Sequence, residues 1–180
     1  MSYKVEKVNP YNADQRKNDQ VTRMFNDIAP MYDRLNGALS LGIDDIIRFE
    51  YQDCAEMTFA DNSFDAATVS FGVRNFEDID KSFQEVRRVV KPGGVFLFIE
   101  LTTPDKSPMK ELYSTYTKYV MPFLSGLFDT EQRAYQYLPE SIAAFPQGRE
   151  MMLILKKNGF RNIRLRRYTL GITTLYIAEK

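Results

Sequence analysis

Apolar positions in the first 42 residues recur with helical spacing. Four of them stand at i, i+3, i+4 and i+7 and so share one face of a predicted helix: Val21, Met24, Phe25 and Ile28. Pro30 ends this helix. A second apolar stripe, which closes near Gly42, predicts another helix: Met31, Leu35 and Leu39. Packing against a core is the expected role of both stripes.

Residues 47–99 alternate between strand and helix patterns. The run IRFEY at 47–51 alternates apolar and polar residues, and residues 66–71 follow a polar loop, so both are predicted strands. A helix follows, with an exposed Glu85–Arg88 pair and four residues on its apolar stripe: Ile79, Phe83, Val86 and Val90. The KPGG segment predicts a turn, and the continuous apolar run 95–99 is typical of a strand buried on both faces.

The C-terminal part opens with a predicted helix at Ser107–Pro108, which supplies a hydroxyl cap followed by proline at the first helical position. Its apolar stripe is rich in aromatic residues: Leu112, Tyr116, Tyr119, Val120, Phe123 and Leu127. Short helical pieces over 131–138 and 139–145 come next, then a helix over 147–157 that ends at Asn158–Gly159. Residues 161–168 and 172–178 predict a terminal antiparallel strand pair.

These elements predict one α/β domain, a mostly parallel sheet with helices on both faces and an antiparallel strand at the edge. Such sheets bind ligands outside the carboxyl ends of their strands. One interval does not fit this pattern. Between Gly42 and Ile47 there are too few residues for even one strand-helix-strand crossover, which takes about 30.

The composition excludes several kinds of partner and catalytic site. The 180 residues include 24 basic and 24 acidic side chains, so no net charge recruits nucleic acid or an anionic membrane. Histidine is absent, which excludes histidine-dependent nucleophilic dyads, HExxH zinc sites and a histidine base. Cys54 is the one cysteine, the N-terminus lacks a secretory signal and no run of about 20 apolar residues occurs. We therefore expect a protein of the reducing cytoplasm without a metal site.

Four segments carry a resemblance to a known family. They read YDRLNGALSLGID at 32–44, DCAEMTFADNSFD at 53–65, TVSFGVRN at 68–75 and RVVKPGGVFLFIELT at 88–102. KPGG before a strand is common, whereas the tyrosine-aspartate segment together with SFGVRN is far more specific. From about Val21 onward the chain resembles the ubiquinone/menaquinone biosynthesis C-methyltransferases, class I enzymes with a Rossmann-like fold that use S-adenosyl-L-methionine (SAM).

The resemblance implies a cofactor site. Asp53 and Cys54 would lie beside the adenine of SAM, and Ser70, at the end of a strand, near its methionyl part. Simple loop capping is the alternative role for Asp53 and Ser70. A buried packing role is the alternative for Cys54, because no histidine is present to activate its thiol.

The resemblance also implies a catalytic group. Arg74 and Asn75 follow the carboxyl end of a strand, where Arg74 would stabilise a developing phenolate and Asn75 would orient the ring hydroxyl. Guanidinium stays protonated, so Arg74 is a poor candidate for a base. Tyr32 and Asp33 would hold the substrate or relay its proton. A surface salt bridge is the alternative role for Arg74.

The expected substrate is a polyprenyl quinol, which needs an apolar groove. Phe71, close to Arg74 and Asn75, is expected to bind the substrate. Four residues of the aromatic helix region are expected to line the tail channel: Met121, Phe123, Leu127 and Phe128. Core packing is the alternative for the aromatic helix. Because such a quinol is insoluble in water, we expect peripheral contact with the inner membrane face; a homodimer is a further arrangement to test.

One part of the family pattern is missing. The glycine-rich loop after the first strand and the acidic residue that binds the ribose have no counterpart, and the family would place them between about Ile43 and Asp45. Three explanations are open: a natural deletion, an engineered one, or roughly 60 residues that belong to the molecule but not to this sequence. Loss of the two central strands would leave a poorly supported sheet, which favours the third.

The expected organisation is therefore one domain in five parts. In chain order, the parts are N-terminal helices over 1–42, the gap at about 43–46, strands 3 to 5 over 47–106, substrate-cover helices over 107–145, and the C-terminal helix and strand pair over 146–180. The expected reaction is SAM-dependent C-methylation of demethylmenaquinol, with the ubiquinone precursor second. Two rivals stay open: a methyltransferase for another lipid or small phenol, and a non-catalytic methyltransferase-like scaffold.

Overall fold

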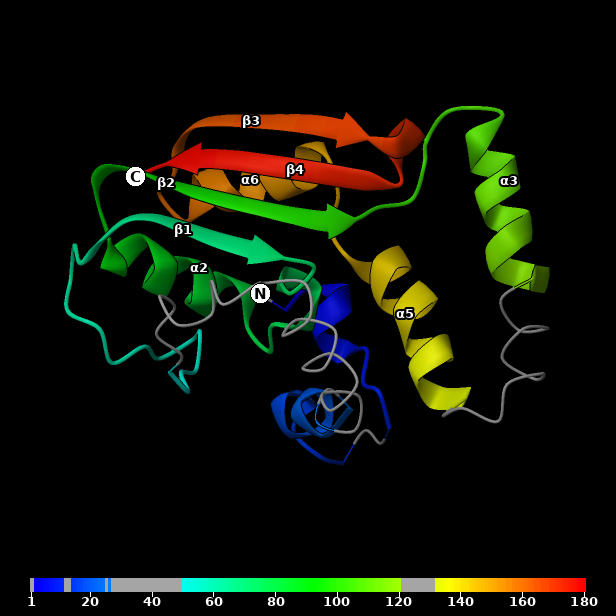
Figure 1. Ribbon diagram of the computed structural model, residues 1–180, viewed down its shortest axis with the longest axis horizontal. Helices are drawn as coiled ribbons and strands as arrows, with labels where there is room; N and C mark the ends of the chain where they lie inside the picture. The colour runs from blue at the N-terminus through cyan, green and yellow to red at the C-terminus, as the bar shows by residue number, and fades with distance from the viewer. Residues whose placement is uncertain (1, 12–13, 25, 27–49, 121–131) are drawn as a thin grey trace, which may run out of the picture.

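The computed structural model describes residues 2–11, 14–24, 26, 50–120 and 132–180 (Figure 1). A helical stretch over 17–24 contains Val21 and Met24, both buried, as the sequence pattern predicts. The longer helices are α2 (Ile79–Val89), α3 (Met109–Thr115), α5 (Gln132–Ala144) and α6 (Arg149–Lys157). Shorter turns of helix are η1 (Lys4–Lys7), η3 (Val73–Asn75), η4 (Tyr116–Val120) and η5 (Thr169–Gly171).

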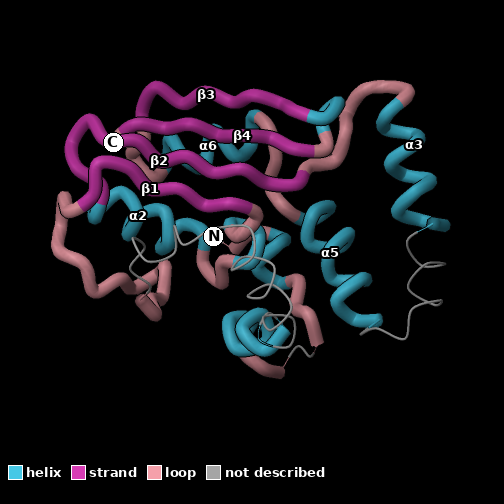
Figure 2. Tube along the Cα trace, in the orientation of Figure 1, coloured by secondary structure: helices cyan, strands magenta, loops and turns pink. Residues whose placement is uncertain are grey.

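Four strands form one mixed sheet in the order β1-β2-β4-β3 (Figure 2). Their bounds are β1 Phe64–Ser70, β2 Val90–Leu101, β3 Arg161–Tyr168 and β4 Thr173–Glu179. Strand β1 runs parallel to β2, whereas β2 and β4, and β4 and β3, are antiparallel. The predicted terminal antiparallel pair is therefore confirmed.

Aromatic side chains fill the core between this sheet and helices α2 and α6. Phe96, Phe98 and Tyr176 are essentially inaccessible, and Phe98 stacks on Tyr176 with ring centroids 4.8 Å apart. Phe83 of α2 meets Phe96 edge to face at 5.5 Å, a favoured geometry for aromatic pairs. Met151 and other apolar residues of α6 join the same cluster. This core fixes the strand ends that position the site.

The opposite face of the sheet is only half buried. Four aliphatic side chains alternate with the core residues and share this face: Leu97, Ile99, Leu175 and Ile177. In the described ranges, α2 and α6 pack on the aromatic face, so the expected cover of both faces is not seen there. Glu50 and Tyr51, the described end of the predicted 47–51 strand, belong to no strand, and Tyr51 is 90% exposed. A strand forms only when it can pair with a neighbouring strand. Among the described residues β1 pairs with β2 alone, so residues 50–51 have no strand partner there.

Helix α6 ends as its sequence predicts. The Gly159 amide binds the Lys156 carbonyl and the Phe160 amide binds the Leu155 carbonyl, the two bonds of a Schellman motif. Gly159 has φ +85°, which glycine adopts without a steric penalty. Phe160 and Leu155 are both buried and provide the hydrophobic contact that accompanies this cap. The chain then turns directly into β3.

Three local predictions were wrong. Helix α3 has no side-chain cap; the Lys110 amide, which a Ser107 cap would bind, donates to the Lys106 carbonyl instead. The two short helices form the continuous α5, which has buried residues before and after Pro139, namely Tyr137 and Ile142. The KPGG segment lies inside β2, because the Gly93 amide and the Gly94 carbonyl bond to Lys180.

Candidate functional site

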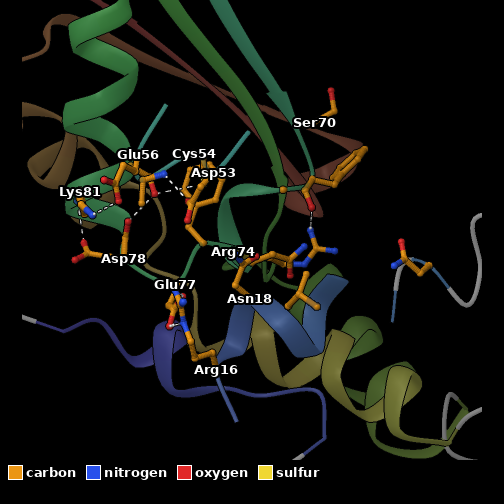
Figure 3. A pocket seen from close by; sticks show the side chains of 18 residues that line it. Arg16, Asn18, Asp53, Cys54, Glu56, Ser70, Arg74, Glu77, Asp78 and Lys81 are labelled. Atoms are coloured by element: carbon orange, nitrogen blue, oxygen red, sulfur yellow. Dashed lines mark hydrogen bonds and ion pairs between the residues drawn. The ribbon is translucent and has the colours of Figure 1, made fainter. Parts of the chain in front are cut away.

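A cavity of about 990 Å³ lies at the carboxyl end of β1 (Figure 3). One wall comes from the N-terminal segment, with Arg16, Asn18 and Val21. The loop that contains Asp53 and Cys54 supplies a second wall. The chain from the end of β1 into the first turn of α2, residues 70–82, supplies the rest. This is the position at which parallel sheets bind ligands.

The loop of Asp53 and Cys54 is fastened to α2. The Arg88 guanidinium donates to the carbonyls of Met57 and Phe59, and it pairs with Glu85 at 2.9 Å, as the helical spacing predicts. Asp53 Oδ1 accepts from the Ala55 amide at 2.9 Å. The loop-capping role is therefore present at Asp53, and its Oδ2 has no partner among the described residues.

Cys54 is a poor nucleophile in this setting. Its Sγ lies 3.5 Å from the Ser82 hydroxyl, and the thiol is half-buried. Burial raises the pKa of Cys54, opposed by the Ser82 contact, so the thiol stays protonated at neutral pH. Cys54 can shape the cavity wall but does not supply a thiolate.

Ser70 and Phe71 form the lip of the cavity where β1 ends. Phe71 has φ +57°, a conformation that costs energy for a bulky residue and often occurs at functional sites. The Phe71 amide donates to Ile99 of β2 at 2.8 Å, which holds this geometry. Ser70 is exposed, and 41% of Phe71 is exposed, so both are available to a ligand.

Arg74 is held in a buried ion pair. Its Nη1 donates to Glu100 Oε2 at 2.8 Å and to the Phe71 carbonyl at 2.5 Å, and its main-chain amide donates to Glu100 Oε1. Arg74 is 7% exposed and Glu100 is fully buried, so the surface salt bridge considered for Arg74 was wrong. Arg74 Nε is buried without a partner among the described residues.

Glu100 is a site residue that the sequence analysis missed. It interrupts the apolar run of β2, and an acidic residue in a buried strand was the available signal. Burial raises the pKa of Glu100, while Arg74 and the Arg74 amide favour its ionised form. The pair fixes the turn η3 against the sheet.

Asn75 has one side of its amide occupied. The Tyr137 hydroxyl donates to Asn75 Oδ1 at 2.8 Å, which leaves the Nδ2 donor of this cavity-lining residue without a partner among the described residues. Tyr137 of α5, also missed from the sequence, is buried, and burial raises its pKa to about 12. Tyr137 therefore remains a hydrogen-bond donor and sets the orientation of the Asn75 amide.

Six of the predicted site residues thus line one cavity: Asp53, Cys54, Ser70, Phe71, Arg74 and Asn75. The other predicted residues lie outside the described residues: Tyr32, Asp33, Met121, Phe123, Leu127 and Phe128. The cavity offers the Asp53 carboxylate and the exposed Ser70 hydroxyl to a ligand. A glycine-rich loop and a ribose-binding carboxylate at the end of a second strand are not found in the described ranges.

Comparison with known proteins identifies the family. Residues 46–180 match the ubiE/COQ5 methyltransferase family. The demethylmenaquinone methyltransferase of Bacteroides fragilis is 38% identical over 245 aligned positions that cover all of both chains, and that of Porphyromonas gingivalis is 31% identical, with 97% of this chain and 98% of the relative covered. The ubiquinone/menaquinone biosynthesis C-methyltransferase UbiE of Geobacter sulfurreducens is 37% identical, with 80% and 59% covered.

Solved structures support the same fold at low identity. The [4+2]-cyclase SpnF matches with a TM-score of 0.55 at 15% identity, covering 81% of this chain and 61% of its own. A SAM-dependent methyltransferase from Thermotoga maritima matches with a TM-score of 0.50 at 16% identity, covering 71% and 61%. The fold is the Rossmann-like α/β fold of class I methyltransferases. By its sequence match over three quarters of its length, the chain belongs to the ubiE/COQ5 methyltransferase family.

Proposed function

We propose that the protein methylates a ring carbon of a demethylated polyprenyl quinol, with SAM as the methyl donor and demethylmenaquinol as the first candidate acceptor. The observation that carries the proposal is the single cavity lined by Asp53, Ser70, Arg74 and Asn75, in a chain similar along its whole length to a demethylmenaquinone methyltransferase. The ubiquinone precursor is the second candidate acceptor, because UbiE is also among the relatives.

The cavity offers polar groups for both the adenine and the methionyl part of SAM. Asp53 Oδ2 is free to accept from the exocyclic amine of adenine, and the exposed Ser70 hydroxyl can bond to the methionyl part. Bound SAM would supply an electrophilic methyl group to the ring carbon and would leave as S-adenosylhomocysteine, while the proton displaced from that carbon would pass to Tyr32, Asp33 or water. The protein contributes position and electrostatics.

Asn75 is the better candidate for contact with the acceptor, and Arg74 acts indirectly, by holding the turn that carries Asn75. The Nδ2 donor of Asn75 can hold the oxygen of the phenolic ring while Tyr137 fixes the amide. Arg74 Nη1 is committed to Glu100 and Phe71, so its main role is to hold the turn and the cavity lip. Its charge, balanced by Glu100, is a weaker stabiliser of phenolate than a free cation.

A further segment completes the site in this proposal. The Bacteroides fragilis comparison spans 245 positions, 65 more than the 180 residues of the chain, and the family match begins at residue 46, next to the interval at about 43–46. Two strand-helix units inserted at this interval could place their strands beside β1 and their helices on the half-buried face of the sheet. Such units would bring the glycine-rich loop and the ribose-binding carboxylate.

A methyl-transfer assay tests the proposed reaction. The purified protein is incubated with methyl-labelled SAM and short-tailed demethylmenaquinol or the ubiquinone precursor, and products are identified by mass. We expect one added methyl group on the quinol ring, and loss of most turnover in Asn75→Ala. Absence of labelled quinol from both acceptors, with SAM bound, would leave another lipid or small phenol as the acceptor.

A second candidate function is a non-catalytic scaffold. It is favoured by one observation: within the described ranges the sheet stops at β1, where the family places its cofactor loop. Titration calorimetry with S-adenosylhomocysteine separates the two candidates. Binding that weakens in Asp53→Ala supports the enzyme, whereas a chain that binds no S-adenosylhomocysteine is the scaffold.

Membrane contact and a homodimer are retained as proposals. None of the helices in the described ranges is long and apolar enough to cross a bilayer. The stripe of α3 and η4 exposes Leu112 and Tyr119 by about 60%, which supports contact with an apolar tail or a lipid surface more than core packing.

A further inference from the structure

Lys17 is a buried cation that the assigned site does not use. It is 3% exposed, and its Nζ donates to the Val5 carbonyl at 2.6 Å and to the Arg74 carbonyl at 3.0 Å. Within the described ranges it has no carboxylate at ion-pair distance. A buried ammonium without an ion-pair partner is costly, so its bonds to these two carbonyls are its main compensation.

The two carbonyls belong to separate parts of the chain. Val5 lies in η1 near the N-terminus, whereas Arg74 lies in η3, the turn that the Glu100 carboxylate holds from the other side. Lys17 stands at the start of the helical stretch 17–24, and its neighbours Asn18 and Val21 line the cavity. One ammonium therefore joins the N-terminal segment, a cavity wall and the turn η3.

Other contacts of the N-terminal segment reach different places. The Glu6 carboxylate accepts from the Ile79 amide, and the Tyr3 hydroxyl donates to Asp80, both at the start of α2. The Arg16–Glu77 pair is exposed and therefore contributes little. Lys17 connects this segment to η3 by a hydrogen bond, and removing Lys17 would leave the buried Arg74 carbonyl without this donor.

We propose that Lys17 is a positioning residue that holds the N-terminal segment against the turn of Arg74 and Asn75 and so fixes the relative position of the cavity walls. We call this pair of hydrogen bonds the lock. Its relevance to methyl transfer depends on the proposed function, but the lock itself does not. Three charged groups face it from the packed elements: Glu6 of η1, Arg74 of η3 and Glu77 beyond η3.

Hydrogen exchange with mass spectrometry tests the lock without any cofactor. The variants are Lys17→Met, which keeps the apolar stem and removes the donors, Lys17→Arg, which keeps charge and donors, and Lys7→Met, the same change at an exposed lysine of the same segment. In Lys17→Met we expect exchange in residues 17–24 and 72–76 to rise at least about tenfold while α6 stays protected. Lys17→Arg should lose less protection, and Lys7→Met none.

Unchanged protection of residues 72–76 in Lys17→Met would overturn the proposal, as would an equal rise throughout the chain. If Lys17→Met does not fold, hydrogen exchange of the unmodified protein tests the proposal instead. Its residues 17–24 and 72–76 should then open as one unit with one opening equilibrium, and distinct equilibria would overturn the lock. A protein that shows the lock and yet transfers no methyl group would refute the proposed function alone.

Discussion

At the scale of single residues, the Arg74–Glu100 pair determines how the turn η3 is held. Breaking a buried pair by removing one charge leaves the other without compensation, because the interior cannot solvate it. The pair also explains why Arg74, for which a surface salt bridge was the alternative role, is almost inaccessible in the structure. A basic residue after a strand gave no indication that its partner lay 26 positions further on, inside the next strand.

Glu100→Gln should lower the free energy of unfolding by about 3 kcal/mol, because Arg74 becomes an unpaired buried cation. Urea denaturation measures this change. Asp65→Asn breaks the exposed Lys91–Asp65 pair and should leave the denaturation midpoint unchanged. Equal midpoints for Glu100→Gln and the unmodified protein would show that the buried pair does not hold the turn.

Lys17 predicts a dependence of stability on pH. Burial lowers the pKa of Lys17 from 10.5 to about 8, so between these values the unfolded chain binds more protons than the folded one. The free energy of unfolding contributed by this group therefore rises with pH above about 8 and is constant below it. Lys17→Arg stays charged and should lack that rise; denaturation at pH 7.5 and 9.5 compares the two, and parallel pH profiles would contradict the account.

At the scale of elements, the start of β2 shows what the KPGG motif does. A Cβ on Gly94 would lie 2.7 Å from the Asp65 carbonyl oxygen, a backbone atom of the neighbouring strand. Gly93 has φ +78° but open space around it. The motif therefore combines a left-handed residue with a close approach of two strands, and its role is structural.

Gly94→Ala should destabilise the protein by about 1–3 kcal/mol, because the strands must separate to admit the methyl group. Gly93→Ala, which meets no atoms, should cost only the left-handed backbone penalty of about 1 kcal/mol. Thermal unfolding of both variants checks the order. A larger loss in Gly93→Ala would mean that backbone conformation, and not strand spacing, is the constraint.

The substrate-cover region gives a prediction about tail length. If Phe123 lines the tail channel, Phe123→Asp should weaken binding of long-tailed quinols more than short-tailed ones, because a charge there meets the distal isoprene units. Leu153→Asp, which also places an acidic residue at an apolar position but on the exposed side of α6, should affect neither. Binding constants for a series of tail lengths decide it, and equal losses for all tails would remove Phe123 from the channel.

The elements that the sequence predicts well are those that local patterns specify. The α2 stripe, the α6 cap at Gly159 and the terminal strand pair depend on residues near one another in sequence. Partners across the fold, such as Glu100 for Arg74 and Tyr137 for Asn75, were missed because no local pattern encodes a contact 26 or 62 residues away. The cavity residues after β1 were accessible through the family resemblance.

At the scale of the whole molecule, the sheet determines what the protein can do. The cavity lies at the carboxyl end of β1. Among the described residues, β1 has no strand on its outer edge, and the sheet face of Leu97 and Ile177 is only half buried. The 65 additional aligned positions of the Bacteroides fragilis relative are the source of a cover for this edge and face in our account. In our proposal methyl-donor binding depends on these positions, because the family resemblance places the glycine-rich loop and the ribose-binding carboxylate there.

The intact mass of the protein, purified from cells that produce it naturally, tests this account most directly. We predict a mass well above the 20.9 kDa of the 180 residues, with the additional residues located by peptide mapping between Gly42 and Ile47. A mass of 20.9 kDa, with a peptide that runs directly from Gly42 through Ile47, would contradict the completed donor site and the methyl-transfer activity that depends on it.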